Sequence, residues 1–515
     1  MQSTDYDVFV IGGGINGVGI ARDAAGRGLN VGLAEMNDLG SATSSASTKL
    51  FHGGLRYLEY FEFGLVRAAL KEREVLWSAM PHIAEPMRFV LPIDPTLRQD
   101  DTTSASKLLN RFAPWLRGRR PVWLTRLGLF LYDHIGGRKK LPATAVLNLT
   151  NHATGTALQS QYKRAFEYSD CSVDDARLVV LTAKDAAARG AEILPRTKVI
   201  QAVQNDTHWR ISLNTGRVVT ARVLINATGP WVSKVQRKVT QTDSTKSIRL
   251  VRGSHIVTRQ LFDHGQPYFL QQPDGRIVFA IPYHDDYTMI GTTDEDHTGD
   301  PSEAECTEVE EAYLIKAANR YLARPITTDD VIWRFAGVRP LFDDGTSDAA
   351  AATRDYSLEV EERGARQITI FGGKITTYRA LSEKVGVKLS QWFPNAGPNW
   401  TAGSPLPGGD FPTNGLAKLV ASISAKYPFI GDKQSARLAR AYGTEAFTLL
   451  DEATSASDLG QDFGAGLTAR EVDWMVGQEW AITAEDVLWR RSKLGLRMTT
   501  TGKAQLETYL ETRNR

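Results

Sequence analysis

The chain has 515 residues, 23% of them charged and 42% hydrophobic, and a formal net charge of +2 at pH 7. At roughly 100 to 200 residues per domain, this length predicts two to four domains around a large core. The near-neutral charge argues against a general nucleic-acid-binding protein, so we expect no nucleic-acid partner. Cys171 and Cys306 are too few for a disulfide framework and lack metal-ligand spacing, which predicts a reducing compartment and no metal site.

The first elements form a strand, a turn, a helix and a second strand. Residues 7–11 are apolar and β-branched, as in a parallel strand covered on both faces. Three glycines follow in G-x-G-x-x-G spacing, and residues 15–27 have a helical pattern that ends at Gly28. Residues 29–34 form a second apolar run that ends at Glu35, 23 positions after the first glycine. This order predicts a dinucleotide-binding βαβ unit.

Each residue of this fingerprint has a mechanical role. Gly12 allows the tight turn, Gly14 lets the backbone approach a pyrophosphate, and Gly17 lets the helix pack on the strand. The helix N-terminus offers free N–H groups to the phosphates. Glu35 can accept hydrogen bonds from both hydroxyls of a ribose. The alternative is a glycine-rich turn without a ligand, followed by an unpaired surface carboxylate.

Later segments favour FAD over NAD, because only a long cofactor would be contacted at several distant points. Residues 41–48 are small or hydroxylated and can line a flavin and its pyrophosphate, although a flexible Ser/Thr loop has the same composition. Glycine turns also follow the strands that end at Asn226 and Phe371. The residues predicted to contact the cofactor are Gly12, Gly14, Gly17, Glu35, Thr43, Ser44, Ser45, Ser47, Val199, Ala227, Thr228, Gly229, Trp231, Gly373, Lys374 and Thr376.

The spacing of these segments predicts an α/β protein whose cofactor domain is discontinuous. We assign the cofactor domain to residues 1–90, 150–245 and 335–393, a basic amphipathic insert to 91–149, a substrate domain to 246–334, a Pro- and Gly-rich linker to 394–412, and a C-terminal helical domain to 413–515. The N-terminus lacks the basic and apolar order of a secretory signal. No window holds the ~18 unbroken apolar residues of a membrane-spanning helix. We therefore expect neither a signal peptide nor a transmembrane helix.

Longer runs carry a specific resemblance over nearly the whole chain. They include IGGGINGVGIARDAAGRGL, TSSAS with HGGLRYLE, NATGPWV, GSHIV, GVRPL, TRDY and GGKITTYR. The chain resembles the FAD-dependent glycerol-3-phosphate dehydrogenases of the aerobic respiratory type. The resemblance implies the Rossmann-like fold of the glycine-oxidase and D-amino-acid-oxidase group, with a sheet-based substrate domain and a helical C-terminal domain. It also implies oxidation of sn-glycerol 3-phosphate at C2 to dihydroxyacetone phosphate, with hydride transfer to FAD.

That reaction requires a site for a phosphate dianion and an acceptor for a proton. The arginines of the shared runs, Arg56, Arg339 and Arg354, are the candidates for the phosphate, because guanidinium groups remain charged and bind oxyanions with paired donors. Tyr57 can add a hydroxyl. A neutral histidine near its ordinary pKa is the natural proton acceptor, and His255 and His52 compete for this role.

Lys374 can serve either the flavin or the substrate. It follows two glycines at a strand end, where a cation would stabilise the negative charge of the reduced flavin ring or would bind the substrate phosphate. The sequence leaves both roles open. The candidate catalytic residues are therefore His255, His52, Arg339 and Lys374.

The segment between Thr96 and Leu124 is longer than the usual loop of the family. Residues 98–140 hold ten basic residues and three aspartates, and Leu108, Leu109, Phe112, Trp115 and Leu116 fall at helical spacing. This composition is typical of an interfacial helix on anionic lipid, although a helix packed on the protein core would also be amphipathic. We expect a peripheral protein on the cytoplasmic face of the inner membrane that passes electrons to a quinone, with a homodimer as a further possibility.

Three other functions compete with this interpretation. A soluble glycerol-3-phosphate oxidase would share the first half-reaction but use oxygen as the acceptor. An amine or amino-acid oxidase of the same fold would need a carboxylate site, and arginines alone do not exclude it. A non-catalytic or tRNA-binding flavoprotein would need a basic groove studded with aromatic residues, which the composition disfavours.

Overall fold

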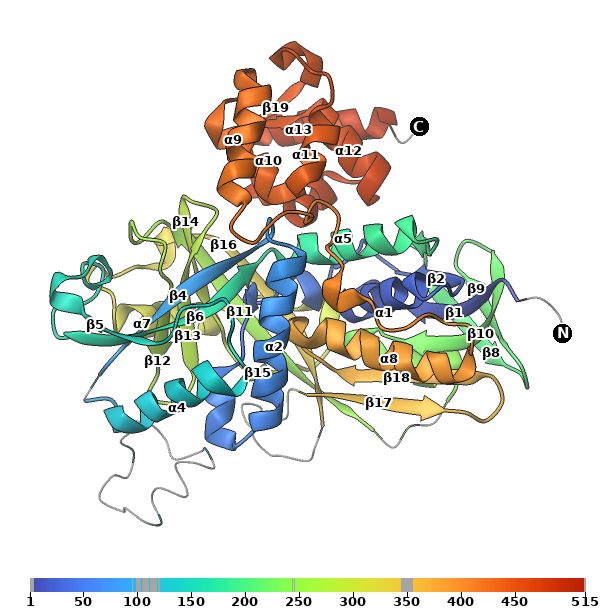
Figure 1. Cartoon of the computed structure of the whole chain (residues 1–515), viewed down its shortest axis with the longest axis horizontal. Helices are drawn as coiled ribbons and strands as arrows, with labels where there is room; N and C mark the ends of the chain where they lie inside the picture. Colours follow the sequence, from blue (N-terminus) through green and yellow to red (C-terminus); the bar gives the residue numbers. More distant parts are fainter. Residues whose placement is uncertain are drawn as a thin grey trace.

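The structure is a computed structural model, and it describes residues 4–94, 96–98, 103, 111, 118, 121–242, 244, 246–343 and 355–513. Figure 1 shows two sheets side by side, with a helical unit coloured orange to red above them. Segments far apart in the sequence contribute to each sheet, so the chain passes repeatedly between the two.

The first sheet contains the predicted glycine turn and has eight strands among the described residues. Its strands lie in the order β17-β18-β10-β1-β2-β7, and β8 and β9 form a hairpin beside β10. Strands β18, β10, β1, β2 and β7 are parallel. The bounds are β1 Tyr6–Ile11, β2 Val31–Ala34, β7 Glu192–Leu194, β8 Val199–Gln204, β9 Trp209–Leu213, β10 Val218–Asn226, β17 Tyr356–Glu361 and β18 Arg366–Gly372.

Both faces of this sheet are covered, as the apolar first strand predicts. Val8 and Val10 point to the face on which the helices α1 (Ile15–Gly26), α5 (Asp175–Ala188) and α8 (Tyr378–Trp392) pack. Phe9 points to the opposite face, where it packs in a cluster that includes Trp209. Side chains alternate along a strand, so a strand buried on both faces has an unbroken apolar run.

The second sheet has ten strands within the described part of the chain, in the order β15-β11-β14-β13-β12-β4-β6-β3, with β16 paired to β11 and β5 to β6. The bounds are β3 Leu50–Phe51, β4 Ala84–Pro92, β5 Ala145–Asn148, β6 Arg164–Val173, β11 Ile248–Arg259, β12 Tyr268–Gln271, β13 Ile277–Tyr283, β14 Tyr287–Gly291, β15 Glu295–Asp296 and β16 Val331–Phe342. Strands β3, β4, β5, β6 and part of β16 come from outside residues 246–334. The helices α2 (Phe63–Ala79), α4 (Val122–Ile135) and α7 (Glu308–Asn319) flank this sheet.

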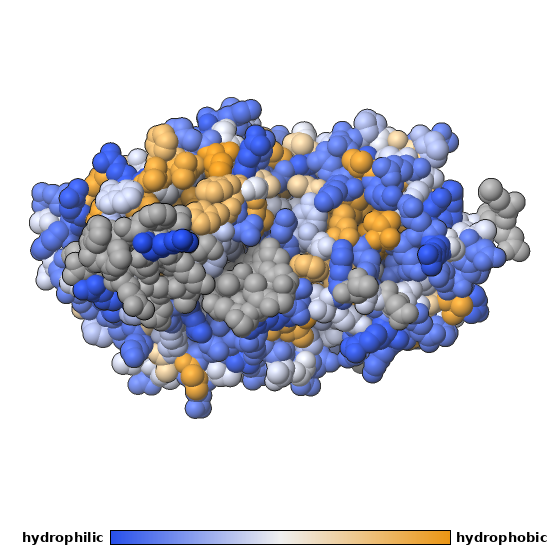
Figure 2. Space-filling model, turned by 90° about the horizontal axis from the view of Figure 1, so that it is seen from below, coloured by the Kyte–Doolittle hydropathy of each residue, from blue (hydrophilic) through white to orange (hydrophobic). Residues whose placement is uncertain are grey.

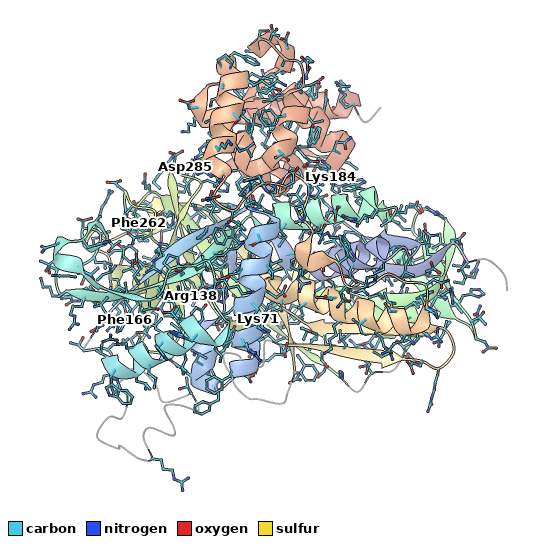
Figure 3. The ribbon with its side chains drawn as sticks, viewed as in Figure 1. Lys71, Arg138, Phe166, Lys184, Phe262 and Asp285 are labelled. Atoms are coloured by element: carbon cyan, nitrogen blue, oxygen red, sulfur yellow. The ribbon has the colours of Figure 1, made fainter. Side chains whose placement is uncertain are left out.

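The C-terminal helical unit has a hydrophobic core of its own. Its helices are α9 Leu416–Lys426, α10 Gly431–Tyr442, α11 Ala446–Leu450, α12 Ala469–Glu479 and α13 Thr500–Arg513, and a short hairpin joins β19 (Asp462–Gly464) to β20 (Leu467–Thr468). Val472 and Met475 are fully buried in this core. The unit rests on α5, where Figure 3 labels Lys184, and the Nζ of Lys184 lies 2.8 Å from a carboxylate oxygen of Glu445.

Candidate active site

One cavity of about 630 Å³ lies at the carboxyl ends of the parallel strands β1, β2, β10 and β18. It is lined by the residues that follow these strands, including Gly12, Glu35, Thr228 and Gly373. It continues along residues 40–48 to Arg339 on β16. Ligands of open α/β sheets bind at the carboxyl ends of the strands, so this cavity is the expected place for a cofactor.

The turn after β1 leaves room only for glycine. Gly12 has a φ of +109°, and a Cβ atom there would lie 2.6 Å from the carbonyl oxygen of Ala227. A Cβ atom at Gly17 would lie 1.9 Å from the carbonyl oxygen of Gly12. The close contact between these segments brings the N-terminus of α1 to the cavity wall, where Gly14 and Ile15 line it. Backbone N–H groups at a helix N-terminus favour a bound phosphate.

Glu35 lies at the end of β2 with its carboxylate held in place. Oε2 accepts a hydrogen bond of 2.7 Å from the Gly13 N–H, and Oε1 accepts one of 2.8 Å from the Asn37 N–H. Burial raises the pKa of this carboxyl group, and the two backbone donors oppose that rise. Glu35 therefore forms a fixed acceptor on the cavity wall, in the position that a ribose diol requires.

The polar groups beside the α1 N-terminus fit the pyrophosphate part of FAD. The Oδ1 atom of Asn16 is buried and has no hydrogen-bond partner among the described residues, and Asn16 lines the cavity. Ser44 accepts a hydrogen bond of 3.0 Å from the Ile15 N–H, which places its hydroxyl beside the α1 N-terminus. An acceptor without a partner and a glycine cradle beside a helix N-terminus are both consistent with a phosphorylated cofactor.

The structure brings most of the predicted cofactor residues to one cavity. The lining includes Gly12, Gly14, Glu35, Thr43, Ser44, Ser47, Val199, Ala227, Thr228, Gly229, Trp231, Gly373, Lys374 and Thr376. Gly17 and Ser45 do not line it. Gly17 packs against Gly12 instead, and the Ser45 hydroxyl turns back to the carbonyl of Ala42 at 3.4 Å. Thr197 and Lys198 line the cavity without having been predicted, because no motif marks them.

Arg339 lines the part of the same cavity that the second sheet forms, whereas Glu35 follows β2 of the first sheet. One of its amino groups donates to Oδ1 of Asp294 at 2.6 Å, and the other donates to the Thr292 hydroxyl at 2.9 Å. Its guanidinium group stands over Gly253, where a Cβ atom would come within 2.3 Å of it. The glycine of the GSHIV run thus leaves space for the arginine, and the carboxylate and hydroxyl fix its orientation.

His255 is fully buried on β11 and does not line the cavity. Its Nε2 lies 3.0 Å from the hydroxyl of Thr48, which does line it, and its ring stacks on Phe335 at 4.7 Å. Burial, followed by the charges of Arg339 and Lys49, holds the pKa of His255 well below its usual value. His255 is therefore neutral at pH 7, and it reaches the cavity through Thr48.

His52, Tyr57 and Lys374 form another part of the cavity wall. The Nζ of Lys374 lies 3.8 Å from the centre of the Tyr57 ring, a cation–π contact. The His52 N–H donates to the Thr376 hydroxyl at 3.4 Å. These contacts join the turn that follows β3 to the turn that follows β18.

The remaining phosphate candidates are Arg56 and Arg354. Arg56 does not line the cavity, and one of its amino groups donates a hydrogen bond of 3.4 Å to the Tyr60 hydroxyl. The Nε atom of Arg56 is buried and has no hydrogen-bond partner among the described residues. Arg354 lies outside the described residues.

Residues 7–379 match the family described as FAD dependent oxidoreductase, and residues 400–512 match the C-terminal domain of alpha-glycerophosphate oxidase. The chain is 46% identical over 512 residues to a glycerol-3-phosphate dehydrogenase of Pseudomonas aeruginosa, covering 98% of this chain and 95% of the relative. It is 45% identical over 514 residues to a D-erythritol 1-phosphate dehydrogenase of Brucella abortus, covering 99% of this chain and 98% of the relative.

A solved structure has the same architecture. The glycerol-3-phosphate dehydrogenase from Bacillus halodurans complexed with FAD matches with a TM-score of 0.72 at 27% sequence identity, covering 99% of this chain and 95% of that chain. These findings confirm the predicted α/β fold class, the predicted cofactor and the resemblance to FAD-dependent glycerol-3-phosphate dehydrogenases. The chain belongs to the FAD dependent oxidoreductase family, and FAD is its cofactor.

Proposed function

We propose that this protein oxidises sn-glycerol 3-phosphate at C2 to dihydroxyacetone phosphate. The observation that carries the proposal is the position of Arg339, an oriented guanidinium group on the wall of the cavity that also contains the cofactor fingerprint. Most of the relatives named above are glycerol-3-phosphate dehydrogenases, and the coverage is nearly complete. FAD, when bound, supplies the acceptor for the hydride that leaves C2.

Arg339 would bind the substrate phosphate and so fix the position of C2. Asp294, Thr292 and the carbonyl of Thr293 orient its guanidinium group at the cavity wall, and paired guanidinium donors suit a phosphate dianion. Arg354 remains a proposed contributor to the same phosphate, whereas Arg56, which does not line the cavity, would have to move to reach it. Phosphate binding of this kind also lowers the barrier, because it positions the reacting carbon.

Lys374 is proposed to act beside Tyr57 at the cavity wall. The Nζ of Lys374 lies over the Tyr57 ring, and both residues line the cavity. The charge of Lys374 can stabilise either the reduced flavin ring or the substrate phosphate.

The proton of the C2 hydroxyl is proposed to leave through Thr48 to His255. The Nε2 of His255 lies within hydrogen-bond distance of the Thr48 hydroxyl, but the lowered pKa that burial, Arg339 and Lys49 give His255 makes its imidazole a weak proton acceptor. His52 is the second candidate, because it lines the cavity directly.

D-Erythritol 1-phosphate is a second candidate substrate. The relative from Brucella abortus is named for it and is nearly as similar as the relative named for glycerol 3-phosphate. Both compounds are polyol phosphates, and they differ by one CHOH group. The phosphate site described above would serve either compound, so the length of the polyol chain is the point to test.

The electron acceptor is proposed to be a membrane quinone, reached from a lipid surface on which α4 lies. The exposed face of α4 includes Trp123, 60% exposed, and Phe130, 56% exposed, and Phe61 and Phe63 are also exposed. Figure 2 shows hydrophobic residues gathered on this side of the molecule. Among the described helices, none has the length and hydropathy to cross a bilayer. Within the predicted lipid-binding segment, residues 108–116 lie outside the described part of the chain, except for Arg111.

Anaerobic mixing of the FAD-loaded protein with each polyol phosphate tests the proposed substrate. Glycerol 3-phosphate should bleach the flavin absorbance near 450 nm, and D-erythritol 1-phosphate should do so more slowly. Faster bleaching by the four-carbon compound would assign the protein to the second substrate. Bleaching by neither compound would end the proposal.

Re-oxidation of the reduced protein tests the acceptor. A ubiquinone analogue should restore the flavin absorbance faster than air-saturated buffer does. Faster re-oxidation by air would favour the oxidase alternative, which the match to the C-terminal domain of alpha-glycerophosphate oxidase keeps open.

Flotation of the protein with anionic vesicles tests whether it binds a lipid surface. Phe130→Ser should weaken the binding to vesicles if α4 is the contact.

A further inference from the structure

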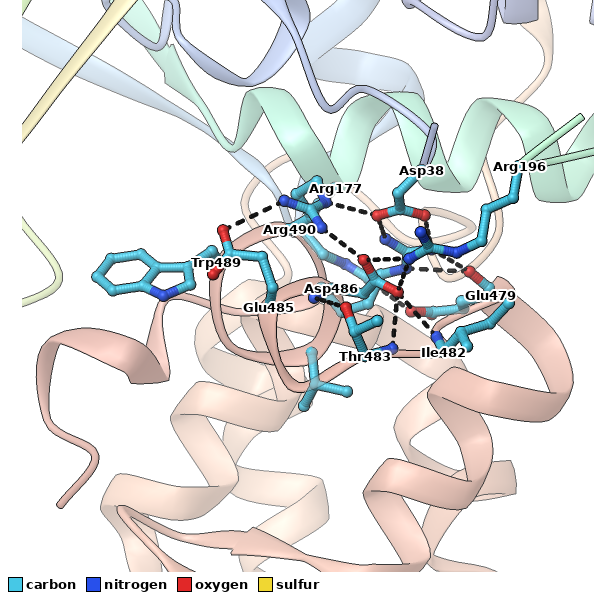
Figure 4. A network of polar contacts seen from close by, with 12 residues as sticks. Asp38, Arg177, Arg196, Glu479, Ile482, Thr483, Glu485, Asp486, Trp489 and Arg490 are labelled. Atoms are coloured by element: carbon cyan, nitrogen blue, oxygen red, sulfur yellow. Dashed lines mark hydrogen bonds and ion pairs between the residues drawn. The ribbon is translucent and has the colours of Figure 1, made fainter. Parts of the chain in front are cut away.

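A buried carboxylate of the cofactor loop is bound by two arginines of the C-terminal unit. Asp38 follows Glu35 in the loop after β2 and is 2% exposed. Its Oδ2 lies 2.5 Å from Nε of Arg490, and its carboxylate also receives both amino groups of Arg491, at 2.5 and 2.8 Å. Figure 4 shows Asp38 in this network. The contact joins residues more than 450 positions apart.

A second carboxylate connects the unit to the segment between β7 and β8, which adjoins the same loop. Asp486 is fully buried, and its Oδ2 accepts the Ile482 and Thr483 N–H groups at 2.8 and 2.9 Å. The same carboxylate pairs with Arg196 at 2.6 Å. It also pairs with Arg490, so the two carboxylates share one arginine.

Both anchors lie next to backbone that lines the cavity. The Arg196 N–H donates to the carbonyl of Asn37 at 2.8 Å, and the Thr197 N–H donates to the carbonyl of Glu35 at 2.7 Å. The residues Glu35, Asn37 and Thr197 line the cavity, while Asp38 and Arg196 do not. The two anchors therefore hold backbone that lines the cavity through residues that do not themselves line it.

We propose that the C-terminal helical unit is a positioning element for FAD, which it holds by locking residues 35–38 and 196–197 at the end of the cavity where Glu35 lies. The inference depends on the FAD cofactor and not on the identity of the substrate. Removing one partner of a buried ion pair leaves an uncompensated charge, so the loop would be released when either anchor is lost. If the Glu35 carboxylate were less firmly positioned, FAD would dissociate faster.

Two variants test the anchors separately. Asp38→Asn removes the charge that Arg490 and Arg491 bind, with almost no change in shape. Arg196→Gln removes the second anchor at a side chain that is 37% exposed, so it should leave the fold intact. Lys184→Gln is the matched control, because the Lys184–Glu445 pair crosses the same interface but touches neither loop.

FAD release from the purified holoenzyme is the readout, followed as the recovery of flavin fluorescence after dilution. We expect Asp38→Asn and Arg196→Gln to increase the release rate at least tenfold, and Lys184→Gln to change it less than twofold. Circular dichroism should report the same helix content in all three. Wild-type release rates in both anchor variants would overturn the inference. An equal increase in all three variants would also overturn it, because general loosening of the interface would then be the cause.

Discussion

The two ends of the cavity are lined by different kinds of group: mainly backbone at one end and mainly side chains at the other. At the end where Glu35 lies, the wall consists of turns and backbone groups that follow strands of one parallel sheet, and ion pairs hold it from behind. At the end where Arg339 lies, side chains from β16, from residues 48–57 and from the turn after β18 converge. Cofactor binding at the first end depends on the backbone conformation, so few substitutions are tolerated there. The second end needs charge and hydrogen-bond chemistry, so substitutions there should alter the reaction before they alter cofactor binding.

The largest effect is expected at Gly12. A Cβ atom in Gly12→Ala would collide with the backbone of Ala227, and the φ of +109° would be strained. We expect FAD affinity to fall more than 100-fold, about 3 kcal/mol, and the protein to purify without its yellow colour. The ratio of absorbance at 450 nm to that at 280 nm measures this loss.

Gly28→Ala is the control for strain alone. Gly28 also has a positive φ, but no atom lies within 4 Å of its added Cβ. It should cost about 1 kcal/mol of stability and retain FAD. Equal loss of FAD in both variants would show that backbone strain, and not the close contact with Ala227, explains the result.

Arg339→Gln should affect the opposite end of the cavity. We expect KM for glycerol 3-phosphate to rise about 100-fold, equal to about 3 kcal/mol, with a lower kcat and an unchanged FAD content. Arg339→Lys should recover part of the activity, because an ammonium group keeps the charge but loses the planar donor pair. Steady-state kinetics with a quinone analogue measure both effects.

Arg334→Gln is the matched control on the same strand. Arg334 pairs with Glu311 and does not line the cavity. Its kinetics should remain close to those of the wild type. Loss of FAD in Arg339→Gln, rather than loss of substrate affinity, would contradict the proposed division of the cavity.

The buried histidines predict how stability depends on pH. The pKa of His255 is held well below its usual value by burial and by nearby cations, and burial lowers that of His82 to about 3. Below an unfolded-state pKa of about 6.5, the unfolded chain takes up protons that the native state does not, so stability falls as the pH falls. Each histidine should cost about 1.4 kcal/mol between pH 7.5 and pH 5.5.

Calorimetric unfolding at these two pH values measures the loss. His255→Gln and His82→Gln should each reduce the difference in unfolding free energy between the two pH values by about 1.4 kcal/mol. A pH dependence that His255→Gln leaves unchanged would mean that His255 titrates normally in the native state, which would contradict its burial behind Thr48.

The smallest effect on turnover is expected from Tyr132→Phe on α4. The Tyr132 hydroxyl accepts the Gly53 N–H at 2.7 Å and lies 2.8 Å from Asp170, so it fixes the turn that carries His52. Its removal should cost about 1 to 3 kcal/mol of stability, because buried polar groups lose their partner. We expect kcat/KM to fall a few-fold. Tyr162→Phe also loses one hydroxyl contact, to the carbonyl of Arg320, and should leave kcat/KM unchanged.

The cofactor end was predictable from the sequence because its determinants are local. The glycine spacing of residues 12–17 specifies a turn before a helix. The acidic residue at the end of the second strand follows the first glycine at the sequence separation expected of such a unit. The reaction end was only partly predictable. Arg339 and Lys374 were found through runs shared with a family, whereas the burial of His255 behind Thr48 depends on how β11 packs between β14 and β16.

The contacts of the C-terminal unit could not be predicted from the sequence. Asp38 has the appearance of an ordinary polar loop residue, and Arg490 and Arg491 that of a surface pair. Their burial arises only when segments at opposite ends of the chain meet. Sequence patterns report local geometry well, but they carry no signal for ion pairs between distant segments.

A crystal structure of the protein with FAD and dihydroxyacetone phosphate would test the two-ended cavity most directly. The account predicts the adenosine ribose within hydrogen-bond distance of Glu35 and the product phosphate within hydrogen-bond distance of Arg339. A product phosphate bound elsewhere, with Arg339 still paired only to Asp294 and its neighbours, would contradict the account.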